Sequence, residues 1–383
     1  MSTQQLSLKN IKQSKPKNMS PTFWSKVHRG IKATIDQYQT RVDHPVFLEI
    51  RESNSQKTIQ THADLSTDVK KPSPQPKPDW TLVISDTDND IQTTIYSLWL
   101  TGLCDQYGNW KPGLPNIQVV HTGDWLNKWR PSRQAVAFYK NLQQSAPTQC
   151  PVTLLNGNHE LEILHMYDNK FSSPLKDDDI DFIRNQGIIH ITANTLFLHG
   201  YPTLNLANIL MQMKREELAL VDFPTRLHKV FYENKRPLYS EPQGMEIIGD
   251  LRRPKYYYEK QVENHKNSQG QEIAGILQSL DINSVVHGHK PNNSVQIDQE
   301  LAKQLPGIRL INNDNRIKQT GLGGMLISSD SEVILLNPET MKDAGGEKGF
   351  RKQLKKRLKT RRKDLGLPSK KLIKQKPKLM LVA

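Results

Sequence analysis

Carboxylate, amide and imidazole side chains recur in this chain directly behind short apolar runs. Asp86 follows the run TLVIS, Asp124 follows NIQVVHTG, and Asn158 follows PVTLLNG. His199 and His289 stand behind TLFL and INSVVHG in the same way. Such oxygen and nitrogen groups are the ligands of divalent metal ions in proteins. This series predicts a metal site rather than unrelated surface residues.

The donor types fit a pair of metal ions. Two divalent ions about 3.5–4 Å apart need a carboxylate that bridges them, with further oxygen and nitrogen ligands on each ion. Such a pair polarises phosphoryl oxygens and deprotonates a water molecule between the ions. The sequence supplies the ligands for such a pair of ions in that order.

The runs that carry these residues alternate with helical patterns from Trp80 onward. Helices are predicted from Ile91 to Leu103 and from Ser132. The predicted strands occupy residues 81–85, 116–122, 151–157, 187–192, 195–200, 282–288, 308–312, 323–329 and 332–338. The last two predict a hairpin. This alternation predicts an α/β fold whose site lies in loops at the carboxyl ends of the strands.

The two ends of the chain differ from this central part. Residues 1–79 hold an amphipathic helical pattern between Trp24 and Val42 and the proline-rich linker KKPSPQPKPDW. We therefore predict an N-terminal extension over residues 1–79, a catalytic domain over 80–340 and a basic tail over 341–383.

The formal charge of +14 belongs to the tail. Between Lys348 and Ala383 lie 15 of the 53 Lys and Arg residues and one of the 39 acidic residues, so the rest of the chain carries 38 of each. Phe350, Leu354 and Leu358 form an apolar stripe at helical spacing in this basic segment. We expect the tail to bind an acidic partner, an anionic membrane or a nucleic acid.

The motifs around the predicted ligands resemble those of one family. The stretches in question are GDWLNKWRPS, NGNHE, LHG, AGILQSLDINSVVHGHKP and GLGGMLISSDSEVILLNP. From about Thr81 to Pro338 the chain resembles the calcineurin-like metallophosphoesterases, and among these the phosphoprotein phosphatases. The resemblance implies a β-sandwich flanked by helices. It also implies a phosphomonoesterase whose substrates are proteins phosphorylated on Ser or Thr, or on Tyr.

The resemblance also implies a set of metal ligands for two divalent ions. Taken from the first ion through the bridge to the second ion, these ligands are Asp86, Asp88, Asp124, Asn158, His199 and His289. Asp88 stands where the family has His, so the ligands of the first ion are all oxygens. We therefore expect Mn²⁺ there, with Mg²⁺ or Fe²⁺ as alternatives, in preference to Zn²⁺.

Further roles follow from the same motifs. His159 would protonate the leaving oxygen, and Asn127 replaces the family's Asp that orients this imidazole. Because an amide carries no charge, we expect a lower pKa for His159. Lys128 stands in the place of a phosphate-binding Arg, and Arg252 or Arg253 would supply the second phosphate contact.

Other functions remain open at this point. Within the superfamily, the chain could be a dinucleoside polyphosphate hydrolase or a phosphodiesterase. Asp88 and Asn127 could instead leave a catalytically impaired, phosphatase-like binding protein. The ending ISDTDND also resembles the haloacid-dehalogenase phosphatases, in which Asp86 would be the nucleophile. That family has Thr or Val where Asp90 stands here.

Cysteine content and hydropathy bear on location. The chain has two cysteines, Cys104 and Cys150, which suits a reducing compartment. It has no apolar stretch of about 20 residues, and MSTQQLSLKN has no apolar signal region. We therefore predict a cytoplasmic protein. The composition and the motifs together also resemble bacterial effector phosphatases delivered into host cells.

Overall fold

The structure is a computed structural model of the 383-residue chain. It describes residues 78–105, 108–111, 116–168, 173–192, 194–219, 268–289, 296–297, 305–314, 324–328, 332–336 and 338–364. The predicted N-terminal helix, Arg252 and Arg253 lie outside these residues. None of the described helices has the length and apolarity needed to cross a bilayer.

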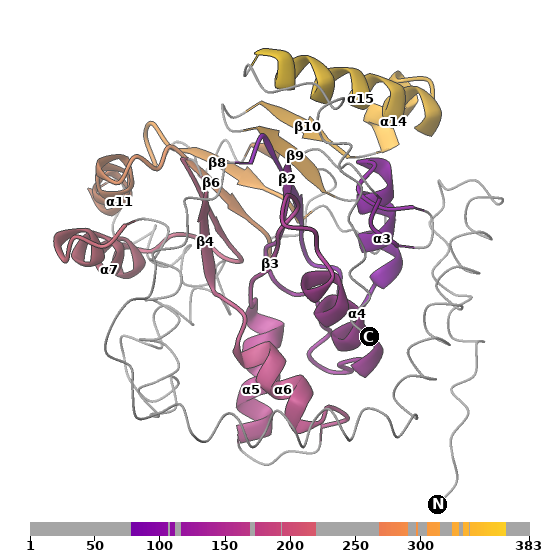
Figure 1. Ribbon diagram of the computed structural model, residues 1–383. Helices are drawn as coiled ribbons and strands as arrows, with labels where there is room; N and C mark the ends of the chain where they lie inside the picture. The colour runs from indigo at the N-terminus through magenta and orange to yellow at the C-terminus, as the bar shows by residue number, and fades with distance from the viewer. Residues whose placement is uncertain are drawn as a thin grey trace, which may run out of the picture.

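Two five-stranded sheets form the centre of the molecule (Figure 1). The first sheet, with strand order β10-β9-β1-β2-β3, consists of β1 (Trp80–Ile84), β2 (Ile117–His121), β3 (Val152–Leu154), β9 (Met325–Ser328) and β10 (Val333–Leu335). Strands β1, β2 and β3 are parallel, whereas β9 is antiparallel to both β1 and β10. The predicted C-terminal hairpin is therefore confirmed.

The second sheet has the order β4-β5-β6-β8-β7. Its strands are β4 (Ile189–Thr192), β5 (Thr195–Leu198), β6 (Ser284–His287), β7 (Gln296–Ile297) and β8 (Arg309–Asn312). Strands β5, β6 and β8 are parallel to one another. Their carboxyl ends therefore lie at one edge of this sheet.

The two sheets pack face to face through a small apolar core. In β1, Val83 faces the second sheet, while its neighbours Leu82 and Ile84 join the core beneath the helices. The core between the sheets takes residues from both of them, namely Val83, Val120, Leu155, Phe197, Val286, Ile311, Met325 and Ile327. The predicted β-sandwich with flanking helices is therefore confirmed.

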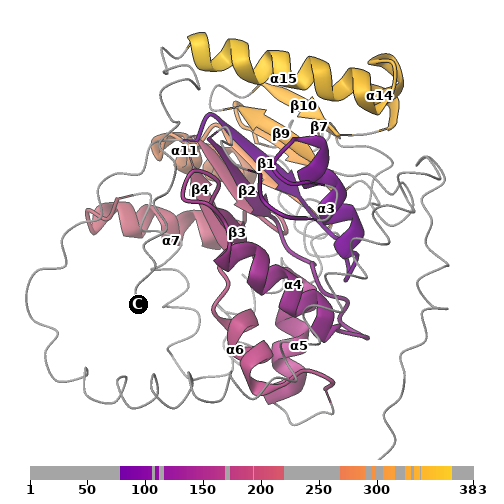
Figure 2. The ribbon, with the colours of Figure 1, turned by 45° about the vertical axis from the view of Figure 1, so that its right-hand side comes forward.

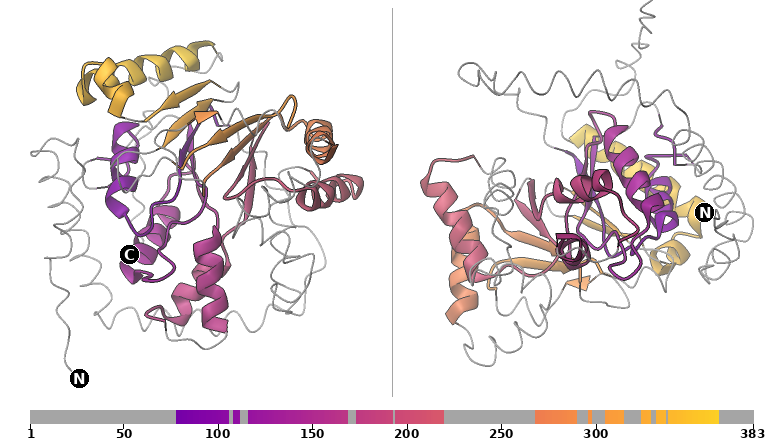
Figure 3. Two further views of the ribbon diagram at one scale, coloured as in Figure 1. Left: turned by 180° about the vertical axis from the view of Figure 1, so that it is seen from behind. Right: turned by 90° about the horizontal axis from the view of Figure 1, so that it is seen from below.

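Helices surround the sandwich (Figure 3). They are α3 (Ile91–Leu100), α4 (Arg133–Gln144), α5 (Asn158–Asp168), α6 (Asp177–Arg184), α7 (Leu204–Arg215), α11 (Ser268–Ser279), α14 (Pro338–Asp343) and α15 (Glu347–Asp364). Helices α7 and α11 lie side by side next to the second sheet. The side chain of Asp90 accepts a hydrogen bond from Thr93 N and caps α3, and Ser132 caps α4 in the same manner.

Helix α15 packs against the body of the protein beyond β10 (Figure 2). The apolar stripe predicted from the sequence is its buried side, because Phe350 and Leu354 belong to the main core and Leu358 packs against it. The guanidinium of Arg351 lies 4.2 Å from the ring centroid of Trp99. The described part of the basic segment is thus a docked helix, and its exposed lysines include Lys348, Lys352, Lys355, Lys356 and Lys359. The binding of this segment to an acidic partner, an anionic membrane or a nucleic acid stays a prediction.

Replacing Leu354 by alanine is expected to lower the free energy of unfolding by about 2–4 kcal/mol, because it leaves a cavity under α15. Lys355→Ala, one residue further along the same helix on its exposed side, should change that free energy by less than about 0.5 kcal/mol. Urea denaturation of both variants measures the difference. Equal effects of the two substitutions would show that α15 is not held by its apolar side.

Candidate metal centre

The loops after β1 and β2 run side by side and hold the acidic residues. Asp86 N donates to Gly123 O at 3.1 Å, and Asp88 N donates to Asp124 O at 2.9 Å. Asp86, Asp88 and Asp124 have φ of 51°, 50° and 54°, and His289 has 66°. Left-handed backbone is costly for residues other than glycine and concentrates at functional sites. The loops therefore maintain four of the six predicted ligands in strained conformations.

The GD and GN motifs meet backbone to backbone. A Cβ on Gly123 would lie 2.7 Å from Gly157 N, and a Cβ on Gly157 would lie 2.6 Å from Asp124 N. Both distances are too short for any side chain. Glycine at both positions therefore lets Asp124 approach the start of α5, which carries Asn158.

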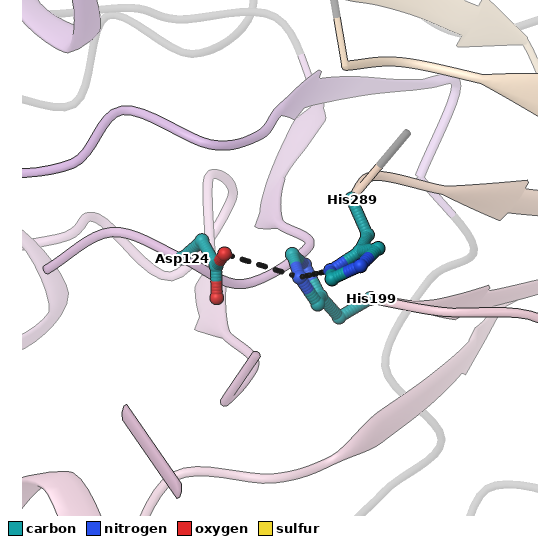
Figure 4. A group of neighbouring side chains, drawn as sticks. All are labelled: Asp124, His199 and His289. Atoms are coloured by element: carbon teal, nitrogen blue, oxygen red, sulfur yellow. Dashed lines mark hydrogen bonds and ion pairs between the residues drawn. The ribbon is translucent and has the colours of Figure 1, made fainter. Parts of the chain in front are cut away.

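Four donor atoms from four different loops or helix ends converge beside this contact. His199 Nε2 lies 3.3 Å from Asp124 Oδ2, 3.1 Å from Asn158 Oδ1 and 3.1 Å from His289 Nδ1. His289 Nδ1 lies 2.7 Å from Asn158 Oδ1. Figure 4 shows Asp124, His199 and His289 pointing toward one another. The ligand atoms of these three residues lie within 4.8 Å of one another. Among the residues that the structure describes, they are the group of His, Cys, Asp or Glu side chains that lie close enough together to hold a metal ion.

The chemistry of this donor set fits a divalent cation. His199 Nδ1 lies 3.0 Å from Thr122 O, and a carbonyl can only accept, so Nδ1 carries a hydrogen and Nε2 faces the other donors. Burial opposes a charged imidazole, but the charge and hydrogen bond of Asp124 and the charge of Asp86 outweigh it and raise the pKa of His199 to about 10. The carboxylates of Asp124 and Asp86 thus surround Nε2 with negative charge, which also suits a bound cation.

The predicted ligands of the first ion do not converge in the same way. Both carboxylate oxygens of Asp86 accept from His289 N, at 3.2 and 3.3 Å. Asp88 Oδ1 instead lies 2.8 Å from His159 Nδ1. The assignment of Asp86 and Asp88 to a first ion therefore stays a prediction.

Asp314 is a further acid at this position that the sequence reasoning missed. Its side chain is buried, two residues beyond the end of β8. Asn312 at the end of β8 pairs with His287 at the end of β6, so Asp314 and His289 each follow a member of this pair by two residues. Burial and then the charge of Asp314 raise the pKa of Asp86 well above its ordinary value. The signal was present in the stretch INNDNR, which places a carboxylate just beyond this strand.

His159 has a different partner from the expected one. Its Nδ1 lies 3.0 Å from Leu126 O and 2.8 Å from Asp88 Oδ1. Burial lowers the pKa of this imidazole, but the hydrogen bond to Asp88 and the charges of Asp124 and Asp88 raise it to about 9. The expected lower pKa is therefore wrong, because Asp88 supplies the negative charge that Asn127 lacks.

Asn127 and Lys128 serve the loop after β2. Asn127 Oδ1 accepts from the backbone N–H groups of Trp129 and Arg130, so this amide shapes the loop and not the imidazole of His159. Lys128 Nζ forms an ion pair with Glu162 Oε1 at 3.1 Å. An ammonium has three N–H donors, so Lys128 keeps two for other acceptors.

The carboxylate of Glu160 links two loops of the site by hydrogen bonds. Glu160 belongs to the motif NGNHE, but the sequence alone did not predict this role. Its carboxylate is fully buried and accepts from Asp124 N at 2.9 Å, Leu126 N at 2.7 Å and Gly157 N at 2.8 Å. One side chain thereby joins the loop after β2 to the loop after β3. Burial, with the charge of Asp124 nearby, raises the pKa of Glu160 to about 7.

The sandwich and the converging donor atoms define a metal-dependent phosphoesterase. The sequence model described as calcineurin-like phosphoesterase matches residues 74–293, and the chain belongs to this family. No curated protein matches the chain.

Several solved structures are similar to this chain. A cold-active protein-tyrosine phosphatase of the psychrophile Shewanella sp. is 19% identical, with 71% of this chain and 85% of that chain covered and a TM-score of 0.47. A protein serine/threonine phosphatase from Saccharomyces cerevisiae is 13% identical, with 68% and 80% covered and a TM-score of 0.42. A putative diadenosine tetraphosphatase is 14% identical, with 68% and 93% covered and a TM-score of 0.38.

Proposed function

We propose that this chain is a metal-dependent phosphomonoesterase that dephosphorylates proteins. The observation that supports the proposal is the convergence of Asp124, Asn158, His199 and His289 next to the imidazole of His159. Asp124 Oδ2 lies 3.4 Å from His159 Nδ1, so the donor cluster and the acid adjoin one another.

Asp124, Asn158, His199 and His289 would hold one divalent ion, and Asp86 and Asp88 with Asp124 would hold a second, with Asp314 close by. When bound, such ions supply an activated water and positive charge for the phosphoryl oxygens. We propose Mn²⁺, because the donors beside Asp86 are carboxylates and hard ions prefer oxygen ligands.

The remaining steps fall to the side chains around the cluster. Asp88 and the Leu126 carbonyl hold the Nδ1 hydrogen of His159, which leaves Nε2 to give a proton to the departing Ser, Thr or Tyr oxygen. The hydrogen bond to Asp88 and the charges of Asp124 and Asp88 favour the protonated imidazole and raise its pKa against the effect of burial. Lys128, oriented by Glu162, offers its other N–H groups to the phosphate.

The test is turnover by the purified full-length chain loaded with Mn²⁺. We expect hydrolysis of p-nitrophenyl phosphate and of phosphopeptides, complete loss after metal removal by EDTA, and recovery when Mn²⁺ is restored. In competition, a phosphopeptide should be preferred over diadenosine tetraphosphate and over bis(p-nitrophenyl) phosphate. Absence of turnover in folded, metal-loaded protein would instead indicate a phosphatase-like binding protein, and a preference for the other substrates would indicate a different member of the superfamily.

A further inference from the structure

Trp129 is exposed beside the candidate site. Its side chain is 75% exposed. Among the residues that the structure describes, no other large hydrophobic side chain is exposed. Burying a large apolar side chain is worth about 1.5–3 kcal/mol. Single exposed apolar residues are common on protein surfaces, so the exposure needs support from the loop that carries it.

The loop that carries Trp129 is rigidly held. Asn127 Oδ1 accepts from Trp129 N and Arg130 N, both at 3.1 Å. Asn89 Oδ1 accepts from Asn127 N and Ser132 N, both at 3.2 Å, and Asn89 Nδ2 donates to Arg130 O at 2.8 Å. Two asparagine side chains thus bind the backbone on both sides of Trp129. Because the backbone around Trp129 is already held by these hydrogen bonds, less backbone freedom remains to be lost when a ligand binds the ring.

The same loop contacts the imidazole of His159. Leu126 O lies 3.0 Å from His159 Nδ1, three residues before Trp129. Lys128 Nζ lies 5.4 Å from the centroid of a Trp129 ring and 3.1 Å from Glu162 Oε1. Glu162 follows His159 by three residues on α5, and residues at this spacing are neighbours on one face of a helix. The loop that carries the indole and the ammonium therefore adjoins His159 and helix α5.

We propose that Trp129 and Lys128 form a platform for the aromatic ring of an aryl phosphate, so that phosphotyrosine in a peptide is the preferred substrate. The proposal rests on the proposed function, because the acid must lie on the side of the departing oxygen. In phosphotyrosine the ring is bonded directly to that oxygen, so the ring would lie near His159 and near the loop that carries the indole. Phosphoserine has no ring to stack, and a nucleobase is separated from its phosphate by a sugar. Aromatic pairs contribute about 0.5–1.5 kcal/mol beyond burial.

The experiment compares two peptides of one sequence, one with phosphotyrosine and one with phosphoserine, on the Mn²⁺-loaded full-length chain. Trp129→Ala should lower the ratio of kcat/KM for phosphotyrosine over phosphoserine about 3- to 10-fold, mainly through KM, and Trp129→Phe should restore most of it. Gln134→Ala, an exposed change on α4, should leave the ratio unchanged. An unchanged ratio in Trp129→Ala overturns the proposal. So does a selective loss of diadenosine tetraphosphate hydrolysis, which would assign the platform to a nucleobase.

A binding measurement separates this proposal from the proposed function. If the wild-type chain hydrolyses no phosphomonoester, the proposed function fails, and the platform is tested with a peptide that contains phosphonomethyl-phenylalanine, which resists hydrolysis. Quenching of tryptophan fluorescence by this peptide in the wild type, absent in Trp129→Ala, supports the platform. Identical titrations of the two proteins overturn it.

Discussion

His159→Asn is expected to lower kcat for a phosphoserine peptide about 10²- to 10⁴-fold, the range typical of a lost general acid. Serine alkoxide is a poor leaving group, so it needs the proton that His159 supplies. p-Nitrophenolate is a stable anion and needs little protonation, so the same variant should lose much less activity on p-nitrophenyl phosphate. Steady-state kinetics on both substrates measure this contrast.

The dependence of kcat on pH is a second test of His159 as the acid. The pKa of His159 is raised to about 9, chiefly by Asp88 and Asp124 acting against burial, so the protonated form predominates below that pH. We expect kcat on phosphoserine to fall as pH rises through this range, and His159→Asn to abolish that limb. Metal content, measured in parallel, should stay at the wild-type level. Equal losses on both substrates would argue against an acid role.

Glu160→Gln is expected to lower the free energy of unfolding by about 2–4 kcal/mol and the affinity for Mn²⁺ about 10- to 100-fold. The buried carboxylate accepts from three backbone N–H groups, and an amide would turn its own NH₂ group toward one of them. Asp124 and Gly157 would then separate, which loosens the meeting of the two loops. Urea denaturation and equilibrium dialysis with Mn²⁺ measure the two effects.

Glu162→Gln is the matched control for this prediction. It makes the same chemical change two residues further along α5, at a partly exposed carboxylate paired with Lys128. Because exposed ion pairs contribute little, its free energy of unfolding should fall by less than about 1 kcal/mol and its metal affinity should stay unchanged. If the two variants behaved alike, the role assigned to Glu160 would be wrong.

The strands of the catalytic region could be read from sequence because their pattern is local. TLVIS, NIQVVHT, INSVVHG and IRLIN are apolar runs that end at polar or glycine residues, and each corresponds to a strand of the sandwich. The helices α5, α6 and α7 were not predicted from periodicity. Helix α5 begins within the motif NGNHE, whose polar residues serve the site and weaken any apolar repeat.

The partners of the site residues are set by contacts between distant segments. His159 was predicted as the acid from its motif, but its pairing with Asp88 joins residues 71 positions apart and depends on how the loops after β1 and β3 meet. For the same reason Asn127 was assigned to His159 although it caps its own loop. A motif identifies a residue type at a position, and it does not say which way the side chain points.

The sequence by itself determined the order of the strands along the chain, the types of the donor residues and the family resemblance, since each of these is written in short contiguous stretches. Only the tertiary structure decided that Asp124, Asn158, His199 and His289 converge, that Glu160 joins two loops and that Asp314 lies near Asp86. It also decided that the apolar stripe of the basic segment is buried and that Trp129 stands exposed on a fixed loop. The physical reason is that convergence, burial and electrostatic influence depend on distances in space, and parallel strands bring together ends that lie tens to hundreds of residues apart in the chain.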